Sequence, residues 1–215
     1  MTNSKDTDFK EQLRTAYDAD AERRVRSEKS REDWKLTARK DFADVAKKEN
    51  KQSLLEIGAG AGIDASYFQE QGFDVLAVDL SPQMVNACKE RGLEAKVFDI
   101  YDLAQLGRQF DAIYSLNVLL HVPKDDLPHI LELIHDSLTP NGIFFYGVYG
   151  GPEQEETSID SSRMNLPRFF SFLSDQTQLQ VVSPYFEVIE SKSIKTNDGH
   201  DAHGLHFQSL LLRKR

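Results

Sequence analysis

The chain has 215 residues, 40% of them hydrophobic, and its 26 Lys and Arg against 35 Asp and Glu give a formal net charge of −9. A single cysteine, Cys88, excludes an internal disulfide, and no CxxC pair is present for zinc or redox chemistry. No apolar run approaches the roughly 20 residues that cross a bilayer, and the first residues begin no apolar signal region. We therefore expect one globular domain in the cytoplasm, with no membrane segment.

The negative charge is unevenly distributed. Residues 1–50 carry 13 basic and 12 acidic side chains, so the acidic excess lies in the rest of the chain. An acidic body repels polyanions, and we therefore expect no DNA binding. The composition leaves a monomer and a homodimer equally open.

Residues 9–49 are predicted to be helical, because they lack Gly and Pro and place apolar residues at helical spacing. Within this segment Tyr17 and Arg39 are candidate lid contacts, and Trp34 is expected to anchor the segment to the sheet. We interpret residues 1–50 as an N-terminal helical lid that belongs to the same domain as residues 51–215.

Strands and helices alternate from residue 53 onward. Ser81-Pro82 is a typical helix start, with Ser as N-cap and Pro in the first turn, and Gly92 stands where a C-cap glycine belongs. The predicted strands are 53–57, 73–78, 95–98, 110–116, 143–149, 186–194 and 205–213, and the predicted helices are 63–71, 82–91 and 124–138.

Five strands that each lead into a crossover predict a parallel sheet with helices on both faces. The last two strands flank Asn197-Asp198-Gly199, a hairpin turn signal. The fold class is therefore α/β: a Rossmann-like, doubly wound, seven-stranded and mostly parallel sheet that ends in an antiparallel hairpin. Residues 150–184 are predicted to be an irregular insertion on the substrate side, with a short helix near 174–180.

The strongest motif is a glycine loop after the first strand, Glu56-Ile57-Gly58-Ala59-Gly60-Ala61-Gly62. Glycines at a strand-to-helix turn let the backbone approach a ligand, and the helix N-terminus behind them offers free N–H groups. Asp79 follows Gly58 by 21 residues, at the end of the second strand. A carboxylate there can accept two hydrogen bonds from a ribose diol.

Two nucleotide-binding alternatives fit this loop less well. The dinucleotide fingerprint GxGxxG requires a third glycine where this chain has Ile63, which disfavours a nicotinamide-dependent oxidoreductase. No Lys-Ser/Thr pair follows the glycines, so nucleoside triphosphate binding is also disfavoured.

Four segments in order resemble class I S-adenosylmethionine-dependent methyltransferases. These segments are residues 56–62, residues 78–84 (Val-Asp-Leu-Ser-Pro-Gln-Met), residues 98–100 (Phe-Asp-Ile) and residues 110–123 (Phe-Asp-Ala-Ile-Tyr-Ser-Leu-Asn-Val-Leu-Leu-His-Val-Pro). The terminal hairpin is also similar to that family, whose sheet ends in an antiparallel strand.

The resemblance implies a role for each matching position. The glycine loop would pass the methionyl part of the cofactor S-adenosyl-L-methionine, Asp79 would hold the ribose, and Asp99 would meet the adenine amino group. The implied cofactor-binding residues are Glu56, Gly58, Ala59, Gly60, Gly62, Asp79, Leu80, Met84, Asp99, Ile100, Ser115, Leu116 and Asn117.

His121 is the candidate acid–base residue, because it follows the fourth strand near the edge where the cleft of such a sheet opens. A structural histidine that stabilises the loop before Pro123 is the alternative. The fourth strand also lacks the Asn/Asp-Pro-Pro-aromatic motif of nucleobase amino-methyltransferases, which argues against base methylation.

The substrate side lies in the variable segments. Candidate substrate contacts are Tyr17, Tyr146, Tyr149 and Arg168, and Arg168 is either a partner for a substrate carboxylate or phosphate or a surface or lid residue. His200, His203 and His206 lie across a hairpin and not on one helix face, so we expect no metal site. Cys88 is expected to be a buried apolar residue.

The sequence therefore predicts a methyltransferase that transfers a methyl group to a small molecule by in-line displacement. A non-catalytic S-adenosylmethionine-binding regulator or partner subunit is the main alternative, and an NAD(P)-dependent oxidoreductase is a further one.

Overall fold

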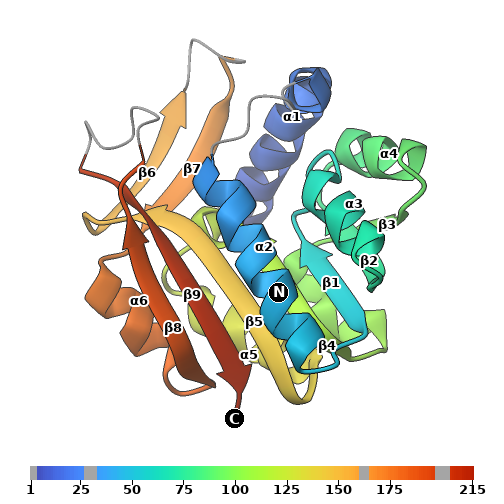
Figure 1. Cartoon of the computed structure of the whole chain (residues 1–215). Helices are drawn as coiled ribbons and strands as arrows, with labels where there is room; N and C mark the ends of the chain where they lie inside the picture. The colour runs from blue at the N-terminus through green and yellow to red at the C-terminus, as the bar shows by residue number, and fades with distance from the viewer. Residues whose placement is uncertain (1–3, 27–32, 160–164, 197–203) are drawn as a thin grey trace.

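Seven strands form the central sheet of the protein, in the order β3-β2-β1-β4-β5-β9-β8 (Figure 1). The structure is a computed structural model that describes residues 4–26, 33–159, 165–196 and 204–215. The strands of this sheet are β1 Ser53–Ile57, β2 Asp74–Asp79, β3 Glu94–Val97, β4 Phe110–Leu116, β5 Leu138–Gly150, β8 Phe186–Ile194 and β9 His206–Lys214.

Neighbouring strands from β3 to β5 pair in parallel, whereas β9 is antiparallel to both β5 and β8. After β1 the chain forms β2 and β3 on one side of β1, and it then forms β4 on the other side of β1. This reversal creates a switch point at the carboxyl ends of β1 and β4, where open α/β sheets bind ligands. The predicted fold class is confirmed.

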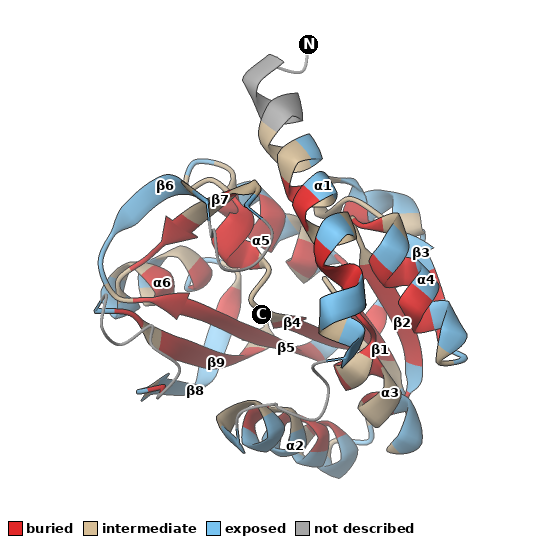
Figure 2. Ribbon diagram, turned by 90° about the horizontal axis from the view of Figure 1, so that it is seen from above, coloured by how far each residue is buried: buried red, intermediate tan, exposed pale blue. Residues whose placement is uncertain are grey.

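Helices cover both faces of the sheet (Figure 1). The helices are α1 Ser4–Arg26, α2 Asp33–Lys48, α3 Ile63–Glu70, α4 Pro82–Glu90, α5 Leu127–Asp136 and α6 Asp175–Val182, with 3₁₀ helices η2 Ile100–Leu106 and η3 Leu119–His121. Helices α2 and α3 pack on one face, and α5 and α6 lie on the other. The central strands β1, β2, β4 and β5 are buried along most of their length (Figure 2), as expected for a parallel sheet covered on both faces.

Local signals explain the boundaries of α4. The Ser81 hydroxyl accepts a hydrogen bond from the Met84 amide at 3.1 Å, Pro82 occupies the first turn, and Gly92 adopts a φ of 78° after the helix. These are the start and stop predicted from the sequence.

The largest differences between the predicted elements and the structure lie in three segments. The segment 9–49, predicted as helical throughout, contains two separate helices, α1 and α2, and β5 begins at Leu138, five residues early. The insertion predicted to be irregular holds a second sheet, formed by β6 Gln154–Ile159 and β7 Pro167–Phe172 in antiparallel register. The turn predicted at Asn197-Asp198-Gly199 lies outside the described residues.

An aromatic cluster fixes α2 to the sheet. Phe42 of α2 is 2% exposed, and its ring centroid lies 5.9 Å from that of Phe68, 5.4 Å from Tyr114 and 5.9 Å from Phe145. On the same helix, the Trp34 ring packs on the Phe207 ring of β9, with the two ring centroids 4.1 Å apart. This contact confirms the expected role of Trp34 as an anchor.

We predict that Phe42→Ala lowers the free energy of unfolding by about 3–5 kcal/mol, because a cavity opens among three rings that cannot collapse together. Urea denaturation measures this change. Leu36→Ala on the same helix is the matched control, since Leu36 is 38% exposed and should change stability by less than about 1 kcal/mol. Equal losses in the two variants would contradict the packing role.

Candidate functional site

The predicted cofactor residues follow the carboxyl ends of β1, β2, β3 and β4, with Met84 in the helix after β2. Helix α1 extends across this edge of the sheet (Figures 1 and 2) and contacts both α4 and β7. The edge therefore has a glycine loop beneath it, strand-end carboxylates around it and a helix above it.

The glycine loop adopts the left-handed backbone that its sequence permits. Gly58, Gly60 and Gly62 have φ values of 68°, 54° and 75°. A Cβ added to Gly58 would lie 2.2 Å from Val118 Cγ2, whereas one added to Gly60 would meet no atom within 4 Å. Gly60 thus leaves an open space above the loop, which a side chain would fill.

Asp79 joins the end of β2 to this loop. Its Oδ2 accepts a hydrogen bond from the Gly60 amide at 2.8 Å, and its Oδ1 accepts one from the Ser81 amide at 2.9 Å. Burial raises the pKa of the Asp79 carboxyl, while these two amide donors from Ser81 and Gly60 oppose that shift. The carboxylate is thereby held in one orientation beside the open space.

The ends of β1 and β4 add buried polar groups. Glu56, the last residue but one of β1, is 3% exposed. Directly after β4, Asn117 adopts a φ of 57°, and its backbone N–H donates a hydrogen bond to the Gly147 carbonyl at 2.7 Å. The buried atoms Ser115 Oγ and Asn117 Oδ1 have no hydrogen-bond partner among the residues that the structure describes. Buried polar atoms without partners are rare, and here they are consistent with a ligand site.

Asp99 lies after β3 and caps η2. Its Oδ1 accepts the Tyr101 amide at 3.0 Å, and its Oδ2 accepts the Lys10 ammonium at 2.9 Å. Lys10 comes from α1, and its Nζ also lies 3.4 Å from the centroid of the Tyr101 ring. Asp99, the residue predicted to meet the adenine amino group, is therefore in contact with α1, the helix that crosses the site.

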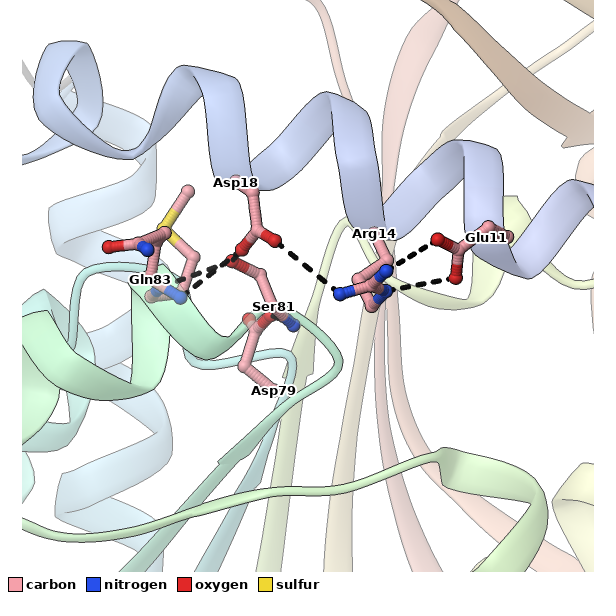
Figure 3. Close-up of polar contacts among 7 residues, drawn as sticks. Glu11, Arg14, Asp18, Asp79, Ser81 and Gln83 are labelled. Atoms are coloured by element: carbon pink, nitrogen blue, oxygen red, sulfur yellow. Dashed lines mark hydrogen bonds and ion pairs between the residues drawn. The ribbon is translucent and has the colours of Figure 1, made fainter.

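Asp18 of α1 makes a second attachment, to the start of α4 (Figure 3). The Asp18 carboxylate accepts hydrogen bonds from the Ser81 hydroxyl and, at 3.2 Å, from the Gln83 amide. A carboxylate at a helix N-terminus also interacts favourably with the helix dipole. Arg14 is paired with Glu11 on the same helix, and its Nη1 lies 3.8 Å from Asp18 Oδ2 (Figure 3).

His121 stands between α1 and β7. The Tyr17 hydroxyl lies 2.6 Å from His121 Nε2, and His121 Nδ1 lies 2.7 Å from the Phe169 carbonyl oxygen. A carbonyl only accepts, so Nδ1 carries the proton and Nε2 accepts from the tyrosine. Burial lowers the pKa of His121 to about 4; the Phe169 bond opposes this shift, and the charges of Arg168 and Arg24 add to it. The ring is therefore neutral at pH 7, with its basic nitrogen toward α1.

The structure brings together only some of the predicted substrate residues. Tyr17 and Arg168 lie near His121, and Arg168 is 6% exposed, so it is not the surface residue that was the alternative. Tyr146 points toward α6, where Gln178 bonds its hydroxyl, and Tyr149 packs on Trp34 in the core.

The other cofactor candidates follow the same edge. Leu80 and Ile100 are half-buried, Leu116 ends β4, and Met84 in α4 is fully buried.

Burial raises the pKa of the Cys88 thiol to about 12, as expected for an inert residue.

Sequence reasoning missed Lys10, Asp18 and Arg24. No motif marks them, but Lys10, Tyr17 and Arg24 are spaced seven residues apart, about two helical turns. That spacing places Lys10, Tyr17 and Arg24 on one face of α1. Helical spacing is therefore the sequence signal that indicates Lys10 and Arg24.

Two other regions do not contribute to this site. A cavity of about 230 Å³ between α2 and strands β8 and β9, lined in part by Trp34 and Leu211, contains none of the strand-end residues. Among the described residues there is no group of three metal-ligating side chains, and His206 bonds Asp175 at 2.7 Å. His200 and His203 lie outside the described residues.

No helix in the described part of the chain is long and apolar enough to span a membrane.

Comparison with known proteins gives partial sequence matches. The ubiquinone biosynthesis O-methyltransferase of Xylella fastidiosa (strain 9a5c) is 32% identical over 99 residues, which cover 43% of this chain and 39% of that protein. Phosphoethanolamine N-methyltransferase 3 of Arabidopsis thaliana is 28% identical over 114 residues, 50% of this chain and 23% of that protein. The match with these curated relatives thus spans about two fifths of their length or less.

Solved structures agree with the fold over nearly the whole chain. The 1,6-didemethyltoxoflavin-N1-methyltransferase of Burkholderia thailandensis, solved with S-adenosylhomocysteine, has a TM-score of 0.71 at 20% identity and covers 100% of this chain and 91% of its own. A DhpI complex with S-adenosylhomocysteine has a TM-score of 0.73 at 17% identity, with 96% and 97% covered.

A family model shows the membership of the chain. Residues 19–182 match the model of a methyltransferase domain, and this range includes the glycine loop and every strand-end residue described above. The chain therefore belongs to the family of methyltransferase domains, and its resemblance to class I S-adenosylmethionine-dependent methyltransferases is confirmed.

Proposed function

We propose that the protein binds S-adenosyl-L-methionine at the carboxyl edge of the sheet and transfers its methyl group to a small-molecule acceptor. The observation that carries this proposal is the Asp79 carboxylate, fixed by the Gly60 and Ser81 amides beside a glycine loop at the switch point. Membership of the methyltransferase domain family supports it.

The residues at the site fit this cofactor. Gly60 leaves open space where the methionyl part would pass, and Ser115 Oγ and Asn117 Oδ1 are buried polar atoms in need of partners. The two oxygens of Asp79 each accept one amide, and a carboxylate has about four lone-pair sites, so it can also accept a ribose diol.

Each predicted cofactor residue has a place in this proposal. Glu56 and the loop would hold the methionyl group, Asp79 the ribose, Leu80, Met84 and Ile100 the adenine ring, and Asp99 the adenine amino group. The loop residues are Gly58, Ala59, Gly60 and Gly62, and Ser115, Leu116 and Asn117 would line the reacting centre.

When bound, the sulfonium of the cofactor supplies an activated methyl group, and its positive charge disappears as the methyl is transferred. A dry and oriented site favours such a reaction, since water stabilises the charged ground state. We propose that α1 is the lid that excludes water, because Lys10 and Asp18 attach it to Asp99 and to the start of α4.

The Tyr17–His121 pair is proposed as the acid–base element. His121 Nε2 is a neutral acceptor, so it can take a proton from the acceptor molecule through the Tyr17 hydroxyl at 2.6 Å. Nδ1 donates to the Phe169 carbonyl and fixes the ring in the tautomer that leaves the lone pair on Nε2.

The net charge of −9 and the single cysteine support a small-molecule enzyme of the cytoplasm that does not bind DNA. We propose a monomer or a homodimer, which sedimentation analysis resolves.

A thermal-shift panel tests the proposed function. S-adenosylhomocysteine should raise the melting temperature, whereas NAD and ATP should not, since a ligand at 100 times its Kd stabilises by about 2.7 kcal/mol. A shift with NAD alone, or with none of the three, would overturn the proposal. Release of S-adenosylhomocysteine with a broad acceptor panel then supports an enzyme, and tight binding with no turnover of any acceptor would favour a regulator.

A further inference from the structure

Strand β8 forms one free edge of the central sheet. Among the described strands it pairs with β9 alone, and β9 separates it from β5 (Figure 1). The seven residues from Glu187 to Ser193 are all exposed, so no helix covers this part of the strand on either face. Half of the N–H and C=O groups of an antiparallel edge strand point away from its neighbour. The β8 edge therefore offers backbone hydrogen-bonding groups to another strand.

Apolar side chains lie toward both ends of this edge. Val188 is 36% exposed and Ile189 is 41% exposed. Toward the other end, Ile194 lines the cavity between α2 and strands β8 and β9, together with Trp34 and Leu211. The apolar surface of the edge thus continues onto α2.

Charges of opposite sign stand between these apolar side chains. Glu190 and Lys192 both line the α2 side of β8, and their side chains are 48% and 43% exposed. Lys192 Nζ lies 2.8 Å from Glu190 Oε2 and 3.5 Å from Asp41 Oδ2 of α2. Since an ammonium has three donors, Lys192 can also bind a carboxylate of another molecule.

This pattern is complementary to itself. When two antiparallel copies of β8 pair about a two-fold axis at Ser191, each Glu190 lies opposite Lys192 of the second copy. Residues directly opposite share a face, with Cβ atoms about 4.5–5.5 Å apart, and opposite charges there stabilise the pair. A two-fold axis at Glu190 or at Lys192 would instead place like charges opposite each other. The charge pattern therefore selects one register.

The exposed apolar residues fit the same register. The ladder between β8 and β9 has a bulge between Val188 and Glu190, so the regular part of β8 runs from Glu190 to Ile194. Beyond the two Glu–Lys pairs, Val188 and Ile189 of one copy come beside the end of the strand that carries Ile194 in the other. Charged pairs at the centre and apolar contacts at both ends then make one continuous interface.

We propose that β8 pairs with β8 of a second copy of this chain, in antiparallel register about Ser191, and so joins two central sheets in a homodimer. Addition of a strand to a free sheet edge is a common mode of association, and an interface of this kind is self-complementary. Because the contact is short, we expect a dimer with a Kd in the micromolar range. The inference goes beyond the proposed function and does not depend on it, since no residue of the cofactor site takes part.

Complementary charge variants of the full-length protein test this proposal by sedimentation velocity. Glu190→Lys and Lys192→Glu each place like charges opposite each other, so each variant should associate at least tenfold more weakly than the parent. An equimolar mixture of the two should form heterodimers, because the lysines of one chain then face the glutamates of the other. The ion pair within each chain stays broken in this mixture, so only a contact between chains restores association.

Lys96→Glu is the matched control. Lys96 lies on β3, the other edge of the sheet, and its Nζ is 3.7 Å from Glu94 Oε1 of the same strand. This variant should dimerise like the parent. An equal loss in Lys96→Glu and Lys192→Glu, parental association of Lys192→Glu, or a mixture that stays monomeric would overturn the proposal.

The parent alone also tests the proposal. A parent that is still a monomer at about 100 μM would overturn it, because a micromolar Kd gives mostly dimer at that concentration. That result would show that the bulge and Lys192 protect the edge from pairing.

A double variant serves if a single variant does not fold. Glu190→Lys combined with Lys192→Glu keeps the ion pair within the chain, in reversed order. It should dimerise with itself but not with fluorescently labelled parent, because mixed chains would place like charges opposite each other. Free exchange of the double variant with the parent would contradict the proposed register.

Discussion

Replacing Asp79 with alanine is expected to weaken the binding of S-adenosylhomocysteine by about 100-fold or more. A hydrogen bond to a charged group contributes about 1.5–3 kcal/mol, and the proposed contact with a ribose diol has two of them. The variant also releases the Gly60 and Ser81 amides, which Asp79 holds at 2.8 and 2.9 Å, so the glycine loop loses its orientation as well. Titration calorimetry measures the loss of affinity directly.

A matched carboxylate distinguishes lost binding from lost stability. Asp111 lies at the opposite, amino-terminal edge of the sheet and accepts the Gln52 and Ser53 amides at 3.0 and 3.1 Å. Asp111→Asn should therefore lower stability but leave the Kd of S-adenosylhomocysteine unchanged. If Asp79→Ala binds as tightly as Asp111→Asn, the ribose assignment is wrong.

The strand-end residues could be predicted because each of them belongs to a short motif. Gly58, Gly60 and Gly62 require only a strand before them and a helix after them, and Asp79 follows at the end of the next strand. The amides of the loop and the Asp79 carboxylate then meet because parallel strands end at one edge. Local spacing therefore contained the geometry of this half of the site.

The contacts of α1 could not be predicted in the same way. Lys10 and Asp99 are 89 residues apart, and Tyr17 and His121 are 104 apart, and the α1 member of each pair belongs to no motif. Helical spacing indicated which residues of α1 share a face, but it could not show which surface that face would cover. The pairing partners are a property of packing and not of local sequence.

The second sheet was missed for a different reason. Strand β6 is exposed along most of its length, so it lacks the alternation of apolar and polar residues that marks a half-buried strand. Its order comes from pairing with β7, whose Arg168 and Phe172 are buried. Tyr146 and Tyr149 precede this insertion on β5, but the alternation of a strand sends their side chains to α6 and to Trp34.

His121 should make the protein unstable in mild acid, and the size of this effect is measurable without knowing the acceptor. Its pKa falls from 6.5 to about 4 on folding, chiefly because the ring is buried. Between those two values the unfolded chain binds a proton that the folded protein does not, so the free energy of unfolding decreases as the pH falls. The loss between pH 7 and pH 4 amounts to about 3 kcal/mol for this residue.

His121→Asn, which keeps a donor for the Phe169 carbonyl but cannot titrate, should lack that part of the pH dependence. Urea denaturation at several pH values measures the difference between parent and variant, and carboxylates that also respond to acid contribute equally to both. His129→Asn is the control, because His129 is exposed on α5 and its replacement should leave the parent's pH dependence in place. An identical acid response in the parent and His121→Asn would mean that folding does not lower the pKa of His121, and the buried environment described for the ring would be wrong.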